Sequence, residues 1–127
     1  MSNPVKQFLI LDDEESIRRS IAAYMEDEGH VVFTAESSEE ALAIMAANHI
    51  HGAVVDIRLP GEDGNAFMLK AVQINPAIQL VVHTGTADYS PPREIRSLGV
   101  TADRVMIKPL GDISPLVQVL VSLVDGS

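Results

Sequence analysis

The stretch Gly52–Gly64 reads G-A-V-V-D-I-R-L-P-G-E-D-G and combines a short apolar run, a carboxylate and a turn. The apolar run ends at Asp56, and the chain then passes through a Pro-Gly turn to Gly64, where a helical pattern begins. Open α/β sheets present reactive groups in this way, in loops at the carboxyl ends of their strands. A strand-ending Asp that merely starts a turn has the same appearance, so the interpretation of Asp56 depends on residues elsewhere in the chain.

Size and composition indicate a single domain over residues 1–127, without an output domain in this chain. The apolar content of 46% argues against disorder, and 127 residues are enough to bury a hydrophobic core. Eighteen acidic residues against nine basic ones give a net charge of −9, which disfavours nucleic acid as a partner. The sequence has no cysteine, no signal-peptide pattern and no apolar run as long as a membrane span. These features predict a cytoplasmic protein without a membrane partner.

Five apolar runs of strand length alternate with helical patterns along the chain. The runs are Gln7–Leu11, His30–Ala35, Ala53–Ile57, Gln79–Thr84 and Arg104–Ile107. The helical patterns that follow them begin near Glu14, Ser37, Gly64, Ser90 and Ser114. Five strand–helix units in alternation predict an α/β fold, in which helices cover both faces of a parallel sheet in a three-layer sandwich.

Two helix starts are predicted from capping signals. Ser37 and Glu40 have the spacing of a capping box. Ser90 is a candidate N-cap, with Pro91 as the first helical residue. The resulting fourth helix is expected to be short and to end at Gly99.

Polar side chains follow four of the five predicted strands at the points where the strands end. They are Asp12 and Asp13 after the first strand, Asp56 after the third, Thr84 at the end of the fourth and Lys108 after the fifth. Because the carboxyl ends of parallel strands meet at one edge of a sheet, we expect these groups to converge there. Each residue alone is a weak signal, but their matching positions together predict a functional site.

This set of groups suits metal-assisted phosphoryl transfer. Three neighbouring carboxylates need a cation at neutral pH, and an open site of oxygen ligands suits Mg²⁺ or Mn²⁺. Asp56 could then form an aspartyl phosphate, while the metal, Lys108 and Thr84 neutralise the phosphoryl oxygens. The sequence lacks a glycine-rich nucleotide-binding loop, so the donor must bring its own activated phosphate.

The same residues carry a resemblance to a known family. The chain resembles a response-regulator receiver domain of two-component systems at Asp12-Asp13, Asp56–Gly64, Thr84-Gly85 and Lys108-Pro109. The motifs occur in the family's order and spacing, and together they span the whole chain. The resemblance implies a flavodoxin-like, doubly wound fold with strand order 2-1-3-4-5.

The resemblance also implies roles for the site residues. Asp56 would accept a phosphoryl group from a phosphohistidine on a sensor histidine kinase or a histidine phosphotransfer protein. Asp13, Asp56 and the backbone carbonyl of Arg58 would bind Mg²⁺, with Asp12 acting mainly through water. Thr84 and Lys108 would bind the phosphoryl oxygens and couple them to a conformational switch.

Two features depart from the family pattern. Receivers usually carry Tyr, Phe or His three positions before the lysine, but this chain has Val105, a β-branched residue with few rotamers. Pro91-Pro92 also interrupts the segment of the fourth helix. Both departures predict intact phosphorylation with an altered or reduced output. The alternative is that Val105 is simply a good strand former and the prolines mark a helix start.

Residues around the site receive separate predictions. Arg58 and Thr86 lie two positions beyond the predicted phosphoacceptor and the hydroxyl, where we expect them to tune the lifetime of the phosphorylated state. Glu62 and Asp63 are interpreted as solvated loop charges. His83 should point to the opposite face of its strand and pack inside the protein.

The last helix carries an apolar stripe formed by Val117, Val121 and Val124, with no obvious use inside the domain. In receivers the surface of helix 4, strand 5 and helix 5 is the usual partner face. We therefore predict that the stripe binds a partner or a second copy of the chain. A wider packing groove is the alternative.

Three hypotheses for the function follow. The first is a phosphorylatable receiver that catalyses only its own phosphorylation and dephosphorylation, and so is not an enzyme for external metabolites. The second is a constitutive protein-interaction module of receiver fold. The third is a Mg²⁺-dependent phosphatase, but these enzymes usually place a second Asp where this chain has Arg58. Turnover of a phosphomonoester would distinguish the third hypothesis from the others.

Overall fold

The computed structural model describes residues 5–126 and contains a five-stranded parallel sheet. The strands are β1 (Gln7–Leu11), β2 (Val31–Ala35), β3 (Gly52–Val55), β4 (Gln79–Thr84) and β5 (Val105–Ile107). All neighbouring strands run parallel, and their order is β2-β1-β3-β4-β5. The predicted α/β fold and the strand order 2-1-3-4-5 are confirmed.

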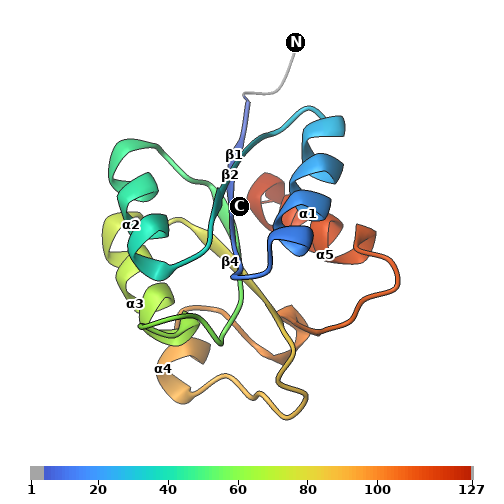
Figure 1. Cartoon of the computed structure of the whole chain (residues 1–127). Coiled ribbons are helices and arrows are strands. Elements are labelled where there is room, and N and C mark those ends of the chain that lie inside the picture. The colour runs from blue at the N-terminus through green and yellow to red at the C-terminus, as the bar shows by residue number, and fades with distance from the viewer. Residues whose placement is uncertain (1–4, 127) are drawn as a thin grey trace.

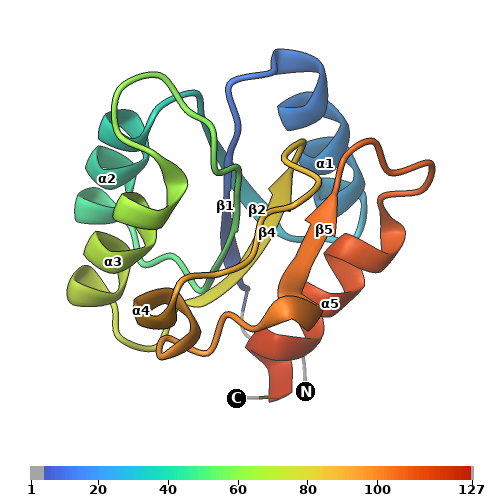
Figure 2. The same cartoon turned by 90° about the horizontal axis from the view of Figure 1, so that it is seen from below.

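Helices cover both faces of the sheet, as Figures 1 and 2 show. On one face lie α1 (Glu15–Asp27) and α5 (Ser114–Gly126). On the other face lie α2 (Ser38–Ala47), α3 (Gly64–Ile74) and the short α4 (Arg93–Arg96). A 3-10 turn, η1 (Ala102–Arg104), leads into β5. Among the described residues, no helix has the length and apolar character needed to cross a membrane.

The hydrophobic core lies in two layers, one on each side of the sheet. In β1, Phe8 and Ile10 pack with α1 and α5, whereas Leu9 and Leu11 pack with α2 and α3. All four side chains are fully buried. A central strand buried on both faces leaves few positions for polar side chains, which explains the continuous apolar runs at residues 8–11 in β1, 53–55 in β3 and 80–82 in β4.

Some strands are shorter than predicted. His30 precedes β2, and Arg104 belongs to η1 rather than to β5. Asp56 and Ile57 follow the last residue of β3. The Asp56 backbone N–H nevertheless donates to the Leu11 carbonyl at 2.9 Å, so backbone pairing still positions the start of this loop.

The fourth helix begins later than predicted, and the assignment of Ser90 as N-cap and Pro91 as first helical residue is wrong. Pro92 is the N-cap, with extended backbone, and the helix covers Arg93–Arg96. A residue that precedes proline is disfavoured in the α conformation, so Pro92 prevents Pro91 from starting the helix. Gly99 closes the following turn with a φ of 95°, which glycine adopts easily.

The capping box predicted at the start of α2 forms in part. The Ser37 side chain accepts a hydrogen bond of 3.2 Å from the Glu40 backbone N–H. The Glu40 carboxylate accepts from the Glu36 backbone N–H at 3.3 Å, one residue earlier than the motif requires. Ser37 is therefore the N-cap, as predicted.

The apolar stripe predicted as a partner face on α5 is largely internal. Val117 and Val124 are 0% and 6% exposed, and Val121 is half-buried against the same core layer. The prediction that these residues have no use inside the domain is wrong for Val117 and Val124. The cause lies on β3, where a Cβ at Gly52 would come within 2.9 Å of the Leu120 and Val124 side chains. The missing side chain lets α5 pack close to the sheet.

Candidate functional site

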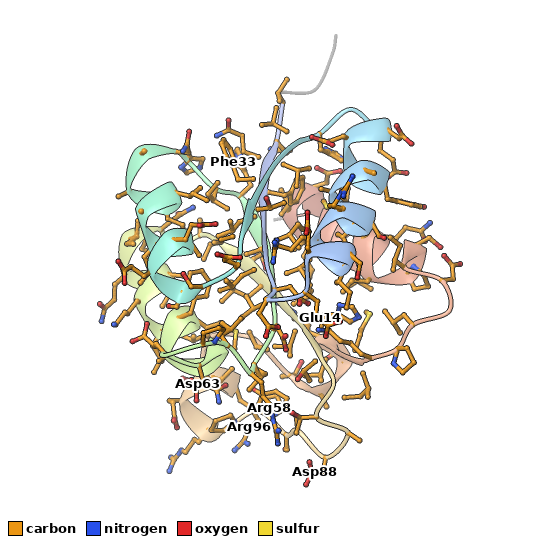
Figure 3. All side chains as sticks on the ribbon, viewed as in Figure 1. Glu14, Phe33, Arg58, Asp63, Asp88 and Arg96 are labelled. Atoms are coloured by element: carbon orange, nitrogen blue, oxygen red, sulfur yellow. The ribbon has the colours of Figure 1, made fainter. Side chains whose placement is uncertain are left out.

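The carboxyl edge of the sheet forms an open acidic cavity of about 470 Å³. Asp12, Asp13 and Asp56 each offer a carboxylate oxygen, and these oxygens lie within 4.8 Å of one another. Asp12 and Asp56 are buried, whereas Asp13 is exposed. Figure 3 shows Glu14, Arg58 and Asp88 near this end of the molecule. The cavity is lined by Asp13, Glu14, Asp56, Arg58, Gly85, Thr86, Ala87, Asp88 and Lys108.

Asp12 is held on all sides at the end of β1. Its backbone N–H donates to the Ala35 carbonyl at 3.1 Å, and its carboxylate Oδ1 accepts from the Glu14 N–H at 2.9 Å. Its backbone carbonyl accepts from the Arg18 guanidinium at 2.7 Å. These contacts restrain both the backbone and the side chain of Asp12 at the edge of the site.

Lys108 is the cation of the cluster, and only 10% of its side chain is exposed. Its Nζ lies 2.8 Å from Asp12 Oδ2, 3.2 Å from Asp56 Oδ2 and 3.3 Å from Glu14 Oε1. Burial opposes the charge, but the Asp12 and Asp56 carboxylates outweigh it and raise the pKa of Lys108 to about 12. The ammonium is therefore a permanent charge at neutral pH and not a proton donor.

At Asp56, unlike at Lys108, burial and neighbouring charge together favour the uncharged form. Burial raises the pKa of its carboxyl group, and repulsion from Asp12 adds to the rise. Lys108 opposes the shift, but it is shared with the other carboxylates and does not cancel it. The ionised form of Asp56 is thus incompletely neutralised by the residues around it.

The donor set fits a hard divalent cation. Asp13 and Asp56 offer carboxylate oxygens to an open cavity, and such oxygens are the ligands that Mg²⁺ prefers. Asp12 Oδ1 accepts a hydrogen bond and Oδ2 lies against the Lys108 ammonium, which leaves Asp12 suited to contact through water. A cation between Asp13 and Asp56 would relieve the repulsion that raises the pKa of Asp56.

Gly64, at the start of α3, packs closely against the backbone of Asp56. Its backbone N–H donates to the Ile57 carbonyl at 2.9 Å, and a Cβ at this position would collide with the Asp56 backbone carbonyl. The atom in the way belongs to the main chain, so it cannot move aside like the end of a side chain. Glycine is required here by close approach and not by its φ angle.

We expect Gly64→Ala to lower the free energy of unfolding by roughly 2–4 kcal/mol, because the loop that carries Asp56 must shift. Urea denaturation measures this change. Gly111→Ala is the matched control, since a Cβ at Gly111 meets no atom within 4 Å. Equal stability of the two variants would contradict the steric explanation.

The other predicted site residues lie around the cavity. Arg58 and Thr86 line it, as their positions in the sequence indicated. Thr84 is fully buried, and its hydroxyl accepts from the Thr86 backbone N–H at 3.2 Å. The Thr84 carbonyl accepts from the Lys108 backbone N–H at 2.8 Å, which joins β4 to the lysine. The structure therefore brings the hydroxyl next to the cavity but not into its lining.

Tyr89, in the loop between β4 and α4, was missed by the sequence analysis. Its hydroxyl donates to Asn65 on α3 at 2.6 Å, and its ring packs on the same core layer as the half-buried Val105. Burial raises the pKa of the phenol, and Asp63 adds to the shift. The sequence signal for a buried anchor was a single aromatic residue in a segment of otherwise small and polar residues.

Glu62 and Asp63 lie outside the carboxylate cluster, as predicted, and Asp63 is exposed, but both acids also make structural contacts that the sequence did not indicate. The Glu62 carboxylate accepts from the Ser38 hydroxyl at 2.7 Å and from the Lys70 ammonium at 2.6 Å. Both bonds lower the pKa of Glu62. Asp63 is the N-cap of α3, with its carboxylate accepting from the Ala66 N–H at 2.9 Å. The two acids thus fix the loop after Asp56 to α2 and α3.

His83 packs inside the protein, as predicted, and is 3% exposed. Within the described part of the chain, neither ring nitrogen has a hydrogen-bond partner. Burial lowers the pKa of His83, and the positive charge of Lys108 lowers it further. The side chain also borders a second cavity, of about 410 Å³, between α1 and the loop that follows β5.

The His83→Leu variant should lose less stability in mild acid than the wild type. The unfolded histidine takes up a proton below its ordinary pKa of 6.5, whereas the buried one resists protonation to a lower pH. Wild-type stability therefore falls as the pH drops below this value. Urea unfolding between about pH 7.5 and 5.5 should show a shallower decline for His83→Leu. Identical slopes would contradict a titrating, unpaired imidazole.

The strand order and the acidic edge together define an α/β protein of the CheY-like class. Comparison with protein families is more specific. Residues 8–120 match the response regulator receiver domain, and the chain belongs to this family.

Individual relatives agree with this assignment. The chain is 32% identical over 111 residues to the transcriptional regulatory protein AruR of Pseudomonas aeruginosa, in a match that covers 84% of this chain and 44% of AruR. The chain spans less than half the length of the first curated relatives it matches. A CheY-like receiver domain from Methanospirillum hungatei superimposes with a TM-score of 0.81 and 27% identity, covering 97% of this chain and 96% of that one.

A second solved structure bears on the chemistry. A response regulator protein from Burkholderia pseudomallei, solved with a phosphorylated aspartic acid, a calcium ion and citrate, is 25% identical to this chain. It superimposes with a TM-score of 0.77 and covers 95% of this chain and 70% of its own.

Proposed function

We propose that Asp56 accepts a phosphoryl group from a phosphohistidine on a sensor histidine kinase or histidine phosphotransfer protein, in the cytoplasm and with Mg²⁺. The observation that carries this proposal is the position of Asp56 among two further carboxylates and Lys108, at an open cavity. Membership of the receiver family supports it, as does the phosphorylated aspartate of the Burkholderia relative.

The proposed reaction is a nucleophilic displacement at phosphorus. An Asp56 carboxylate oxygen attacks the phosphorus atom, the bond from phosphorus to the donor imidazole nitrogen breaks, and an acyl phosphate forms on Asp56. Mg²⁺ bound at Asp13, Asp56 and the Arg58 carbonyl would neutralise charge on the transferring group. Lys108 would neutralise a second phosphoryl oxygen, and its pKa of about 12 keeps it charged throughout.

Thr84 would contribute to the third oxygen and to the switch. Its hydroxyl now accepts from the Thr86 N–H, and it would turn to donate to the phosphoryl group once Asp56 is modified. Attack of water on phosphorus reverses the modification and releases inorganic phosphate. Arg58 and Thr86, at the rim of the cavity, are positioned to regulate the access of that water and so the lifetime of the acyl phosphate.

The output would be a change in the face formed by α4, β5 and α5. Val105 offers no aromatic ring to rearrange there, and α4 has only four residues. These observations favour an alternative function, a constitutive interaction module with weak or no phospho-switching. A contact through α5, including a homodimer, would use the outer groove lined by Pro115, Gln118, Val119, Ser122 and Leu123.

Intact mass after incubation with acetyl phosphate tests the phosphoacceptor function. We expect a gain of one phosphoryl group with Mg²⁺ and none with EDTA. Light scattering of both forms then separates the two functions, because a phospho-switch predicts a change in self-association or partner binding. Absence of any gain, with acetyl phosphate and with a panel of phosphorylated kinases, would leave the constitutive module as the better account.

A further inference from the structure

We propose that Arg18 on α1 is a positioning residue for the divalent-cation site, acting through the backbone of the Asp12–Asp13 pair. This inference rests on the proposed function, because it concerns the metal that function requires. Arg18 contributes no ligand atom. Its role is to set the direction in which Asp13 presents its carboxylate.

The first observation is the bond between Arg18 and the loop. Its guanidinium reaches back from α1 and donates to the Asp12 backbone carbonyl at 2.7 Å. The other guanidinium nitrogen lies 3.9 Å from the Glu36 carboxylate, beyond the end of β2. Only 15% of the Arg18 side chain is exposed. A guanidinium is a rigid fork of donors, so the short bond to the Asp12 carbonyl restricts its orientation, and the exposed Glu36 carboxylate adds a weaker attraction.

The second observation concerns Asp13. In the region the structure describes, the exposed Asp13 side chain makes no hydrogen bond or ion pair. Its place in the carboxylate cluster therefore depends on its backbone. The Asp12 carbonyl and the Asp13 N–H belong to one planar peptide group, so a bond to that oxygen fixes the plane from which Asp13 extends. Arg18 is thus the side chain that fixes this peptide plane, beside the Glu14 N–H bond to Asp12 Oδ1 that closes the turn around Asp13.

The neighbouring residue offers a matched comparison. Arg19 has the same side chain and the same charge, but 79% of it is exposed, and among residues 5–126 its one ion pair is with Glu15, one turn earlier, at 3.8 Å. Removing either arginine removes one positive charge near an acidic site. By Coulomb attraction alone, each loss should strengthen cation binding. A positioning role for Arg18 predicts the opposite sign for that residue.

The test compares Arg18→Met, Arg18→Lys and Arg19→Met with the wild type. Mn²⁺ affinity is measured from the electron paramagnetic resonance signal of the free ion, and Mg²⁺ affinity by competition. Loss of an outer partner that orients metal ligands typically weakens binding 10- to 100-fold, and we expect about 10-fold for Arg18→Met. Arg19→Met should bind as tightly as the wild type or slightly more tightly. Arg18→Lys, which keeps one donor, should fall between.

Folding and positioning are separated by two further readouts. Far-UV circular dichroism and urea unfolding without metal show whether each variant is folded. Phosphorylation by acetyl phosphate should recover in Arg18→Met when Mn²⁺ is raised to saturation, because the missing effect is affinity. If Arg18→Met does not fold, Arg18→Lys carries the test, with about threefold weaker binding expected.

Equal Mn²⁺ affinities for the Arg18 variants and Arg19→Met would overturn the inference while leaving the proposed function intact. Failure of the wild type to bind either ion would instead contradict the proposed function. The two failures are therefore distinguishable in one titration series.

Discussion

Lys108→Ala is expected to lower the free energy of unfolding by about 3 kcal/mol in the absence of metal, and the melting temperature by about 10 °C. The ammonium is almost fully buried and lies within 3.3 Å of three carboxylates. Its removal leaves Asp12 and Asp56 buried without a counter-charge, and breaking a buried pair in this way is strongly destabilising.

The same variant should lose at least about 100-fold in the rate of phosphorylation, because a preorganised charge at the transferring group is removed. Thermal unfolding and phosphorylation by acetyl phosphate measure the two effects. Lys70→Ala is the control, since Lys70 pairs with Glu62 at the surface and lies outside the cavity lining. A Lys108→Ala variant as stable as Lys70→Ala would contradict the role of Lys108 as the shared counter-ion.

Asp56→Asn is expected to abolish phosphorylation and to increase stability at neutral pH without metal. The pKa of Asp56 is raised by burial and by Asp12, so the folded state favours the protonated form. The wild type therefore loses stability as the pH rises from the ordinary pKa of 3.8 through the raised folded value. Asparagine carries no charge and avoids this loss, with an expected gain on the order of 1 kcal/mol, or about 3 to 5 °C.

Metal should reverse that order. Mg²⁺ binds the carboxylate form, so it should raise the melting temperature of the wild type and have little effect on Asp56→Asn. The advantage of the variant should also disappear below the ordinary pKa of 3.8, where both chains are neutral at this position. A variant that is less stable than the wild type at neutral pH without Mg²⁺ would contradict the electrostatic account.

The strands and the site edge could be predicted because both depend on simple rules. A central strand buried on two faces must be a continuous apolar run, and parallel strands must end at one edge. Asp12, Asp13 and Asp56 follow such runs directly, and Lys108 follows the short apolar edge strand β5. Their approach to within bonding or coordinating distance needed no knowledge of individual side-chain contacts.

The features that the sequence analysis missed depend on pairs of distant residues. Glu62 meets Ser38 and Lys70 because the loop after β3 folds over α2 and α3, and no local pattern contains that geometry. The internal stripe of α5 depends on Gly52, more than sixty positions earlier, which sets how closely the helix packs. The role of Arg18 could likewise not be predicted from the sequence, because its partner is a backbone carbonyl outside its own helix.

The start of α4 is a different kind of error, since a local rule would have corrected it. The pattern Ser90-Pro91 favours Pro91 as a first helical residue, but Pro92 directly after it disfavours the helical conformation there. The short helix that results leaves the loop between β4 and α4 to be held by Tyr89 and Asn65.

The central claim is that the phosphoryl group is carried by Asp56. Borohydride reduction of the phosphorylated protein, followed by peptide mass mapping, tests it most directly, because reduction converts an aspartyl phosphate to homoserine. Homoserine is expected in place of Asp56 alone, in a reaction that requires Mg²⁺ and is absent in Asp56→Asn. Conversion at Asp12 or Asp13, or phosphorylation that persists in Asp56→Asn, would contradict it.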